Sequence, residues 1–175
     1  MIKGLSERRR LTRLGKIKLG VMIVEPGRRA YPRSVDYLVC PPEVQAVHGE
    51  RPKELPVMLP SDDPANVFPQ DLKMYRAAGL WCMGDGERAR RWGDDGKLHE
   101  LACPCPFLES GECGAVATLH IALPDVPGVG VYTITTGNKR SIIQLNSQLE
   151  GFVTAFGGLR GIPFVLKLED EQIQR

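Results

Sequence analysis

The chain of 175 residues contains no long hydrophobic run. No stretch approaches the roughly 20 consecutive apolar residues that a membrane-spanning helix needs. The first residues also lack the apolar core that a secretory signal peptide carries. These two absences argue against a membrane protein and against a secreted one, and we expect the protein in the cytoplasm.

The sequence also lacks the common motifs of catalysis. It has no nucleophile elbow, no glycine-rich phosphate-binding loop and no His-Glu-x-x-His helix. The adjacent acids Asp94 and Asp95 stand between two glycines, which is typical of a solvated hairpin tip rather than of an acid–base pair. We therefore expect no enzyme activity and no catalytic residues.

Internal repeats and low-complexity segments are absent as well, and the net charge is only +2. With 42% hydrophobic and 25% charged residues the composition is that of an average soluble globular protein. The 19 glycines and 14 prolines favour short strands and turns over a helical bundle. The length suits one ordinary domain, so we expect residues 1–175 to form a single domain.

Cysteines, in contrast, are clustered. Four of the five, Cys82, Cys103, Cys105 and Cys113, lie within 32 residues, and two of them stand in a Cys-Pro-Cys-Pro run. Glycines and prolines beside the thiols supply tight turns, which can bring four thiolates to one tetrahedral metal ion. We predict that these four cysteines bind zinc in a turn-rich insert at residues 79–114.

Other interpretations of the thiols stay open. Their spacing, Cys-x20-Cys-x-Cys-x7-Cys, differs from the usual Cys-x2-Cys knuckles, and an iron–sulfur cluster also takes four thiolates. Disulfide bonds would suit a secreted chain, and unligated buried thiols are a further alternative. His99 could replace one cysteine as a ligand, although a solvated strand face is its more ordinary place. The separate Cys40 follows an apolar run and is typical of a small buried hydrophobe.

Charge is unevenly distributed, because residues 1–18 form a basic N-terminal arm with Glu7 as its single acid. Such a cluster can neutralise DNA phosphates and release counterions. The candidates for contact with DNA or with a protein partner are Lys3, Arg8, Arg9, Arg10, Arg13 and Lys16. The alternative is a solvated terminal segment, and the lack of aromatic residues in the arm gives no support to stacking on single strands.

Hydrophobic patterns and turn residues predict the order of the elements. Strands are expected at residues 17–24, 34–40, 54–59, 116–123, 130–136 and 162–168. Hairpin ends are expected at 84–86 and 93–96, and a short helix from Ser61 to about Met74 or Tyr75.

One longer helix is predicted near the C-terminus. Apolar residues from Ile142 to Phe156 recur every three or four positions, Asn138 or Ser141 can cap the start, and Gly157 ends the pattern. The fold class expected is α+β, with a mainly antiparallel sheet or small barrel, this one amphipathic helix, and the four-cysteine metal-bound insert.

Several segments resemble one known family. Residues 2–20, 31–37, 51–55, 82–86, 103–106 and 130–132 are similar, in order and spacing, to recombination directionality factors of actinophage type. These are accessory proteins of large serine integrases, and the resemblance extends from Lys3 to about Leu168.

The resemblance implies a regulator rather than a catalyst. Such a factor binds a large serine integrase, on its attachment-site DNA, and switches it from integration to prophage excision in the bacterial host cell. Some members of the family are described as metal-binding, whereas His99 lies outside the family pattern. The alternative function is a sequence-nonspecific DNA-binding module that uses the basic arm. Neither reading involves a membrane or a small-molecule substrate.

Overall fold

The structure, a computed structural model, describes residues 11–169 and divides them into two compact units. Unit 1 contains residues 11–62, 120–134 and 159–169, and unit 2 contains residues 63–119 and 135–158. Lys3, Arg8, Arg9 and Arg10 of the predicted contact set lie outside the described residues. The expectation of a single domain stays a prediction. The strands β8 and β9, defined below, contribute residues to both units.

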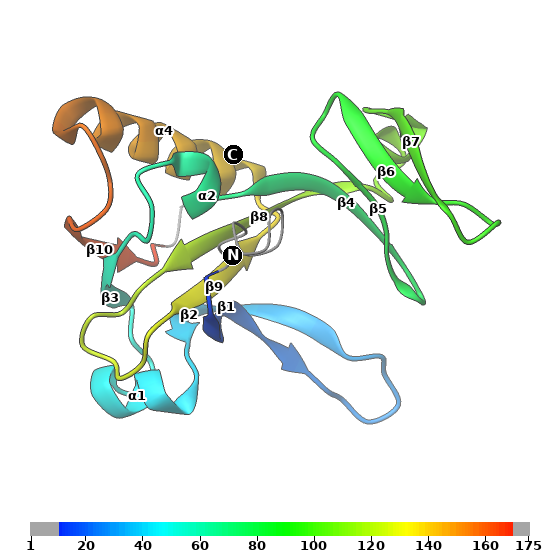
Figure 1. The fold of residues 1–175 in the computed structure, drawn as a ribbon. Helices are drawn as coiled ribbons and strands as arrows, with labels where there is room; N and C mark the ends of the chain where they lie inside the picture. Colours follow the sequence, from blue (N-terminus) through cyan, green and yellow to red (C-terminus); the bar gives the residue numbers. More distant parts are fainter. Residues whose placement is uncertain (1–10, 170–175) are drawn as a thin grey trace, which may run out of the picture. The chain divides into compact units, whose positions relative to one another are not determined.

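Ten strands and four helices follow one another along residues 11–169 (Figure 1). Their bounds are β1 Arg13–Ile23, β2 Tyr31–Val39, α1 Pro42–His48, β3 Glu54–Met58, α2 Pro64–Val67, β4 Gln70–Arg76, β5 Gly79–Gly84, β6 Arg88–Trp92, β7 Leu98–Ala102, α3 Pro106–Glu109, β8 Gly114–Ile121, β9 Val131–Thr136, α4 Lys139–Phe156 and β10 Pro163–Lys167. No helix among these residues is long and apolar enough to cross a membrane.

The hydrogen-bonded strand order is β2-β1-β9-β8-β4-β5-β6-β7, and β10 pairs with β3 in a separate two-stranded sheet. Strand β1 runs parallel to β9, whereas β1 with β2, β4 with β5 and β8, and β6 with β5 and β7 are antiparallel. This confirms a mixed α+β fold with a mostly antiparallel sheet. The order has two free ends, β2 and β7, among the strands described, so the sheet alternative fits and the small barrel does not.

The core of unit 1 collects fully buried side chains from six elements and the segment after α4. They are Ile17, Leu38, Val44, Leu55, Ile121, Tyr132 and Leu159. Helix α1 supplies Val44 and is not among the elements expected from the sequence, where two prolines follow the strand expected at residues 34–40. Proline is also favoured at the first helical position, where its missing N–H costs nothing, and Pro42 occupies that position.

The helix predicted from Ser61 to about Met74 is wrong over most of its length. Its start signal is real, since Asp63 Oδ1 accepts a hydrogen bond of 3.0 Å from the Ala65 N–H. The helix ends at Val67, and β4 begins at Gln70. Pro69 explains the early end, because a residue before proline is disfavoured in the helical conformation, and Phe68 adopts φ −134° and ψ 65°.

Helix α4 follows the apolar stripe that the sequence shows. The Asn138 side chain accepts hydrogen bonds from the N–H groups of Arg140 and Ser141, and Gly157 ends the helix at φ 75° in the left-handed conformation. Ile142 and Leu149 are buried beneath it. The amides of Gln70 and Asn146 exchange two hydrogen bonds of 2.6 and 3.0 Å, which tie α4 to the start of β4 within unit 2.

A thiol cluster as the candidate metal centre

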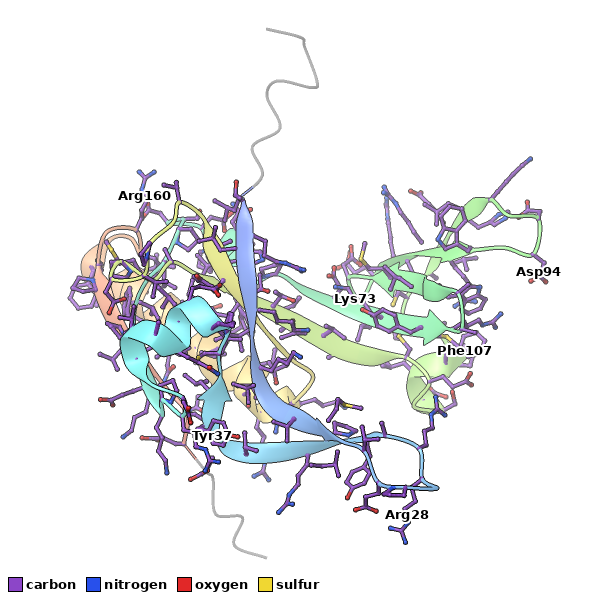
Figure 2. All side chains as sticks on the ribbon, turned by 90° about the horizontal axis from the view of Figure 1, so that it is seen from below. Arg28, Tyr37, Lys73, Asp94, Phe107 and Arg160 are labelled. Carbon is purple, nitrogen blue, oxygen red and sulfur yellow. The ribbon has the colours of Figure 1, made fainter. Side chains whose placement is uncertain are left out.

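Two successive hairpins carry the cysteine-rich segment in unit 2. Asp85 closes the β5–β6 turn by accepting hydrogen bonds of 2.8 Å from the N–H groups of Glu87 and Arg88, and these donors lower the pKa of the Asp85 carboxyl. Asp95 accepts from Lys97 N–H in the β6–β7 turn, near Asp94 in Figure 2. Both turns fall where glycines predicted hairpin ends, so the acidic residues have a structural role here.

Strand register brings Cys82 into a buried position. Cys82 pairs with both Met74 of β4 and Arg91 of β6, and it is 5% exposed. The register between β4 and β5 shifts at this point, which leaves Trp81 as the additional residue of a β-bulge. Both Trp81 and Cys82 consequently pack into one apolar cluster instead of facing opposite sides of the sheet.

The other three cysteines come from the connection after β7. The Cys103 N–H donates to the Glu87 carbonyl at 2.9 Å, and Cys105 precedes the first turn of α3. The Cys113 N–H donates to the Phe107 carbonyl at 2.8 Å. These backbone bonds fold the connection back onto β5 and β6, so residues 31 positions apart in sequence come together.

The four thiols are neighbours, and three of them belong to this cluster. Cys82 and Cys113 belong to its buried core with Met74 and Ala89, and Cys103 packs against it. Burial raises the pKa of the Cys113 thiol, and the nearby sulfurs of Cys82, Cys105 and Cys103 raise it further. A Cβ placed on Gly84 would lie 3.0 Å from Cys103 Sγ and 2.8 Å from the Arg88 carbonyl, so only glycine leaves space for this sulfur.

An arginine lies against the thiols. Arg91 Nη2 donates a hydrogen bond of 3.1 Å to Cys105 Sγ, and its guanidinium is 4.9 Å from the ring centroids of both Trp81 and Phe107. Burial opposes the charged form of Arg91, but hydrogen bonds and charge attraction from Cys82 and Cys105 outweigh burial and raise the pKa of Arg91. The site therefore combines a fixed positive charge with thiols that can carry negative charge.

Two aromatic rings hold this arginine in place. Trp81 and Phe107 meet edge to face, with centroids 5.8 Å apart. Arg76 covers the Trp81 ring at 3.4 Å from its centroid. Cations over aromatic faces are attracted by the ring quadrupole, so the rings both fix Arg91 and replace part of the solvation that it loses.

Cys40 takes no part in this cluster. It belongs to unit 1, is 6% exposed, and has its pKa raised to about 11 by burial. The structure thus separates the fifth cysteine from the other four, as their sequence positions predicted.

The donor set and the geometry give different answers about a metal. Four neighbouring thiols, with glycine leaving room for one sulfur, are the ligand type that zinc prefers. Within residues 11–169, however, no three His, Cys, Asp or Glu side chains are arranged so that they could hold a metal ion. Metal binding would need the thiol side chains to turn toward one point, and the hydrogen bond from Arg91 to Cys105 would adjust with them.

The remaining predicted residues lie elsewhere. His99 stands on β7, about half exposed, with its Nε2 2.9 Å from Asp95 Oδ1, so its partner is the turn and not the thiols. Arg13 and Lys16 are exposed on β1 in unit 1. Sequence reasoning missed Arg91, Trp81 and Phe107. One sequence signal was available for Arg91. Ala89 stands two positions before it on the same strand, so this small residue and the arginine share one face of the sheet.

Comparison with known proteins identifies the family. Nothing matches among curated proteins or among solved structures. One family model does match, over residues 14–175, and it is described as Gp3-like, recombination directionality factor-like. The match takes in both units, the β1–β2 hairpin and all four clustered thiols, and it confirms the resemblance seen in the sequence. The chain therefore belongs to the Gp3-like family of recombination directionality factor-like proteins.

Proposed function

We propose that this protein binds a large serine integrase and switches it from integration to prophage excision. The observation that carries the proposal is the family match over residues 14–175, because that family is tied to the direction of DNA recombination and hence to a recombinase partner. In this proposal the protein is an accessory factor with no catalytic residue, and the integrase cuts and rejoins the DNA.

Thermodynamics sets what the protein must do. A factor that binds two arrangements of a recombinase equally well shifts neither, however tight the binding. Moving an equilibrium from 1:99 to 99:1 takes a preference of about 10⁴-fold, or about 5.5 kcal/mol. The protein must therefore favour the integrase arrangement formed on excision sites.

A recombination assay with two plasmid substrates tests the switch. The purified chain is added to the large serine integrase of the same genome, with either integration sites or excision sites on the plasmid. We expect excision product to rise and integration product to fall, both with the same dependence on protein concentration. The measurement is the fraction of each plasmid recombined at equal integrase concentration.

A tyrosine recombinase from the same genome, assayed on its own sites, serves as the control. A response of that enzyme alone would assign the protein to a different recombinase class. No change in either direction with the serine integrase would contradict the proposed switch.

We also propose that Cys82, Cys103, Cys105 and Cys113 bind zinc. The support is their convergence in one cluster and the thiolate preference of zinc, whereas an iron–sulfur cluster remains the alternative ligand for the same four residues. A bound zinc would supply a structural cross-link, since four protein ligands leave no open position for chemistry. The cross-link would join β5 to the connection that precedes β8.

Arg91 gives this zinc proposal a sharper test. Its guanidinium donates to a proposed ligand, and loss of an outer partner of a metal ligand typically costs 10–100-fold in metal affinity. We expect Arg91→Met to weaken zinc binding by about 10-fold to 100-fold. Competition with a chromophoric chelator measures the affinity, and circular dichroism checks that the fold is kept.

Arg90→Met is the matched control on the same strand. Arg90 pairs with Met83 in register and forms only an exposed ion pair of 3.6 Å with Glu100, so its loss should leave zinc affinity nearly unchanged. Equal weakening by both substitutions would show that Arg91 acts through general charge and not through the thiols.

A further inference from the structure

The β1–β2 hairpin of unit 1 carries a long exposed end. From Lys18 to Ser34 no side chain is buried, although Ile17 before this stretch and Leu38 after it are core residues. The strands pair in register from Gly20 with Ser34 to Ile23 with Tyr31. Figure 1 shows the loop of this hairpin (blue) lying away from α1, β3 and β10 of the same unit. An isolated two-stranded hairpin is only marginally stable. Burial of side chains in the core does not stabilise the exposed end of this hairpin.

Positive charge is concentrated on this hairpin. Residues 13–39 carry six lysines and arginines against Glu25 and Asp36, a net charge of +4 compared with +2 for the whole chain. The Asp36 carboxylate forms an ion pair of 2.8 Å with Lys53, so it does not neutralise the cations of the hairpin. The hairpin is thus a cationic extended surface of unit 1.

Most of these cations are free to meet an external anion. Arg28, at the hairpin end in Figure 2, is bridged to Glu25 at 3.2 Å, and Glu25 also accepts a hydrogen bond from Tyr31. No carboxylate among residues 11–169 is paired with the remaining five, which are Arg13, Lys16, Lys18, Arg29 and Arg33. The ribbon has the chemistry of a surface that binds a polyanion.

Apolar side chains accompany the charges. Met22 and Pro32 are cross-strand partners, and Met22 is 58% exposed and Val24 77% exposed. In the major groove, apolar side chains contact the thymine methyl group while arginines and lysines reach the phosphates. Exposed apolar residues within a cationic ribbon therefore fit duplex DNA better than they fit a free phosphate compound.

We propose that the β1–β2 hairpin lies in a groove of duplex DNA, with Arg29, Arg33, Lys16 and Lys18 meeting phosphates. The major groove admits a two-stranded ribbon, and the charge of the hairpin complements the DNA backbone. This inference goes beyond the proposed function, because it assigns a DNA surface to the protein itself and does not depend on which recombinase it serves. It also places the contact on a folded hairpin instead of on the N-terminal arm alone.

Fluorescence polarisation of a labelled duplex of mixed sequence tests the proposal. The full chain and its Arg29→Gln, Arg33→Gln double variant are titrated at several salt concentrations between about 50 and 200 mM. Each phosphate contact contributes about 0.9 to the slope of log affinity against log salt, so the double variant should lower the slope by about 1.8. Near 0.1 M salt this corresponds to a loss of about 60-fold in affinity.

Two charge-matched variants complete the experiment. Arg88→Gln with Lys97→Gln removes two exposed charges from unit 2, and Arg8→Gln with Arg9→Gln removes two from the N-terminal arm. Both should bind DNA more tightly than the hairpin variant does. Equal loss in the unit 2 variant, or loss confined to the arm variant, would overturn the proposal.

Two further outcomes also count against it. One is the absence of salt-sensitive DNA binding by the unaltered chain. The other is a hairpin variant that keeps its DNA affinity but no longer binds the recombinase in the absence of DNA, because the ribbon would then be a protein-binding surface. The recombination assay separates this failure from failure of the proposed function, since excision can still respond to a chain that makes no DNA contact.

Discussion

The protein purified under reducing conditions should contain about one zinc ion per chain, and Cys105→Ser should lose it. Structural zinc binds small domains with an apparent free energy of about 10–16 kcal/mol near pH 7, so loss of one ligand is expected to empty the site. Elemental analysis measures the metal content. Affinity should also fall as pH is lowered, because the thiols must be deprotonated to bind the metal.

Tryptophan fluorescence shows where the structure responds to metal loss. The chain has two tryptophans, Trp81 on β5 and Trp92 on β6, and Trp81 packs into the thiol cluster. Cys105→Ser or a chelator should therefore shift tryptophan emission to longer wavelength. Far-ultraviolet circular dichroism follows chiefly α4, none of whose residues belongs to the thiol cluster, and it should change much less.

Cys40→Ala is the matched control for this experiment. It removes the one cysteine that lies in unit 1, so metal content and tryptophan emission should stay as in the unaltered chain. A metal-free preparation that keeps the emission of the folded protein would show that apolar packing alone maintains the thiol cluster. Iron in place of zinc would favour the iron–sulfur alternative.

Phe68→Ala should lower the free energy of unfolding by about 3–5 kcal/mol. Phe68 follows α2 in unit 2 and is 1% exposed. Removing its ring loses the free energy of burying it and leaves a cavity that the neighbours fill only in part. Urea denaturation followed by circular dichroism measures the change.

Phe156→Ala makes the same substitution at an exposed position of the same unit. Phe156 is 64% exposed and touches Phe152 with ring centroids 6.1 Å apart, so we expect a loss of about 1 kcal/mol or less. Similar losses for the two variants would mean that Phe68 is not a core residue. If Phe68→Ala lowers the free energy of unfolding equally with and without metal, the apolar core stabilises unit 2 in addition to the thiols.

Local patterns determined a large part of the fold. The stripe from Ile142 to Phe156 specified α4 together with its caps at Asn138 and Gly157, because helix periodicity and capping act within a few residues. Glycine and aspartate likewise specified the two hairpin turns around β6. The start of α2 is also local, but the helix is shorter than predicted because Pro69 disfavours the helical conformation at Phe68.

The thiol cluster shows where local reasoning stops. The sequence by itself determined that four cysteines stand close together along the chain and that Cys40 is separate. Only the tertiary structure decided that a bulge brings Trp81 and Cys82 into one cluster, that Arg91 meets Cys105, and that Phe107 packs against Trp81 and Arg91. These contacts depend on strand register, since a shift of one residue would move every side chain to the other face.

The same distinction holds for the charged surface. The sequence determined that the N-terminal part of the chain is basic and that the chain belongs with recombination directionality factor-like proteins. Only the tertiary structure decided that Arg29 and Arg33 join Lys16 and Lys18 on one exposed hairpin, while Asp36 is paired with Lys53. The register between β1 and β2 sets which of these charges become neighbours, and no short sequence pattern carries that information.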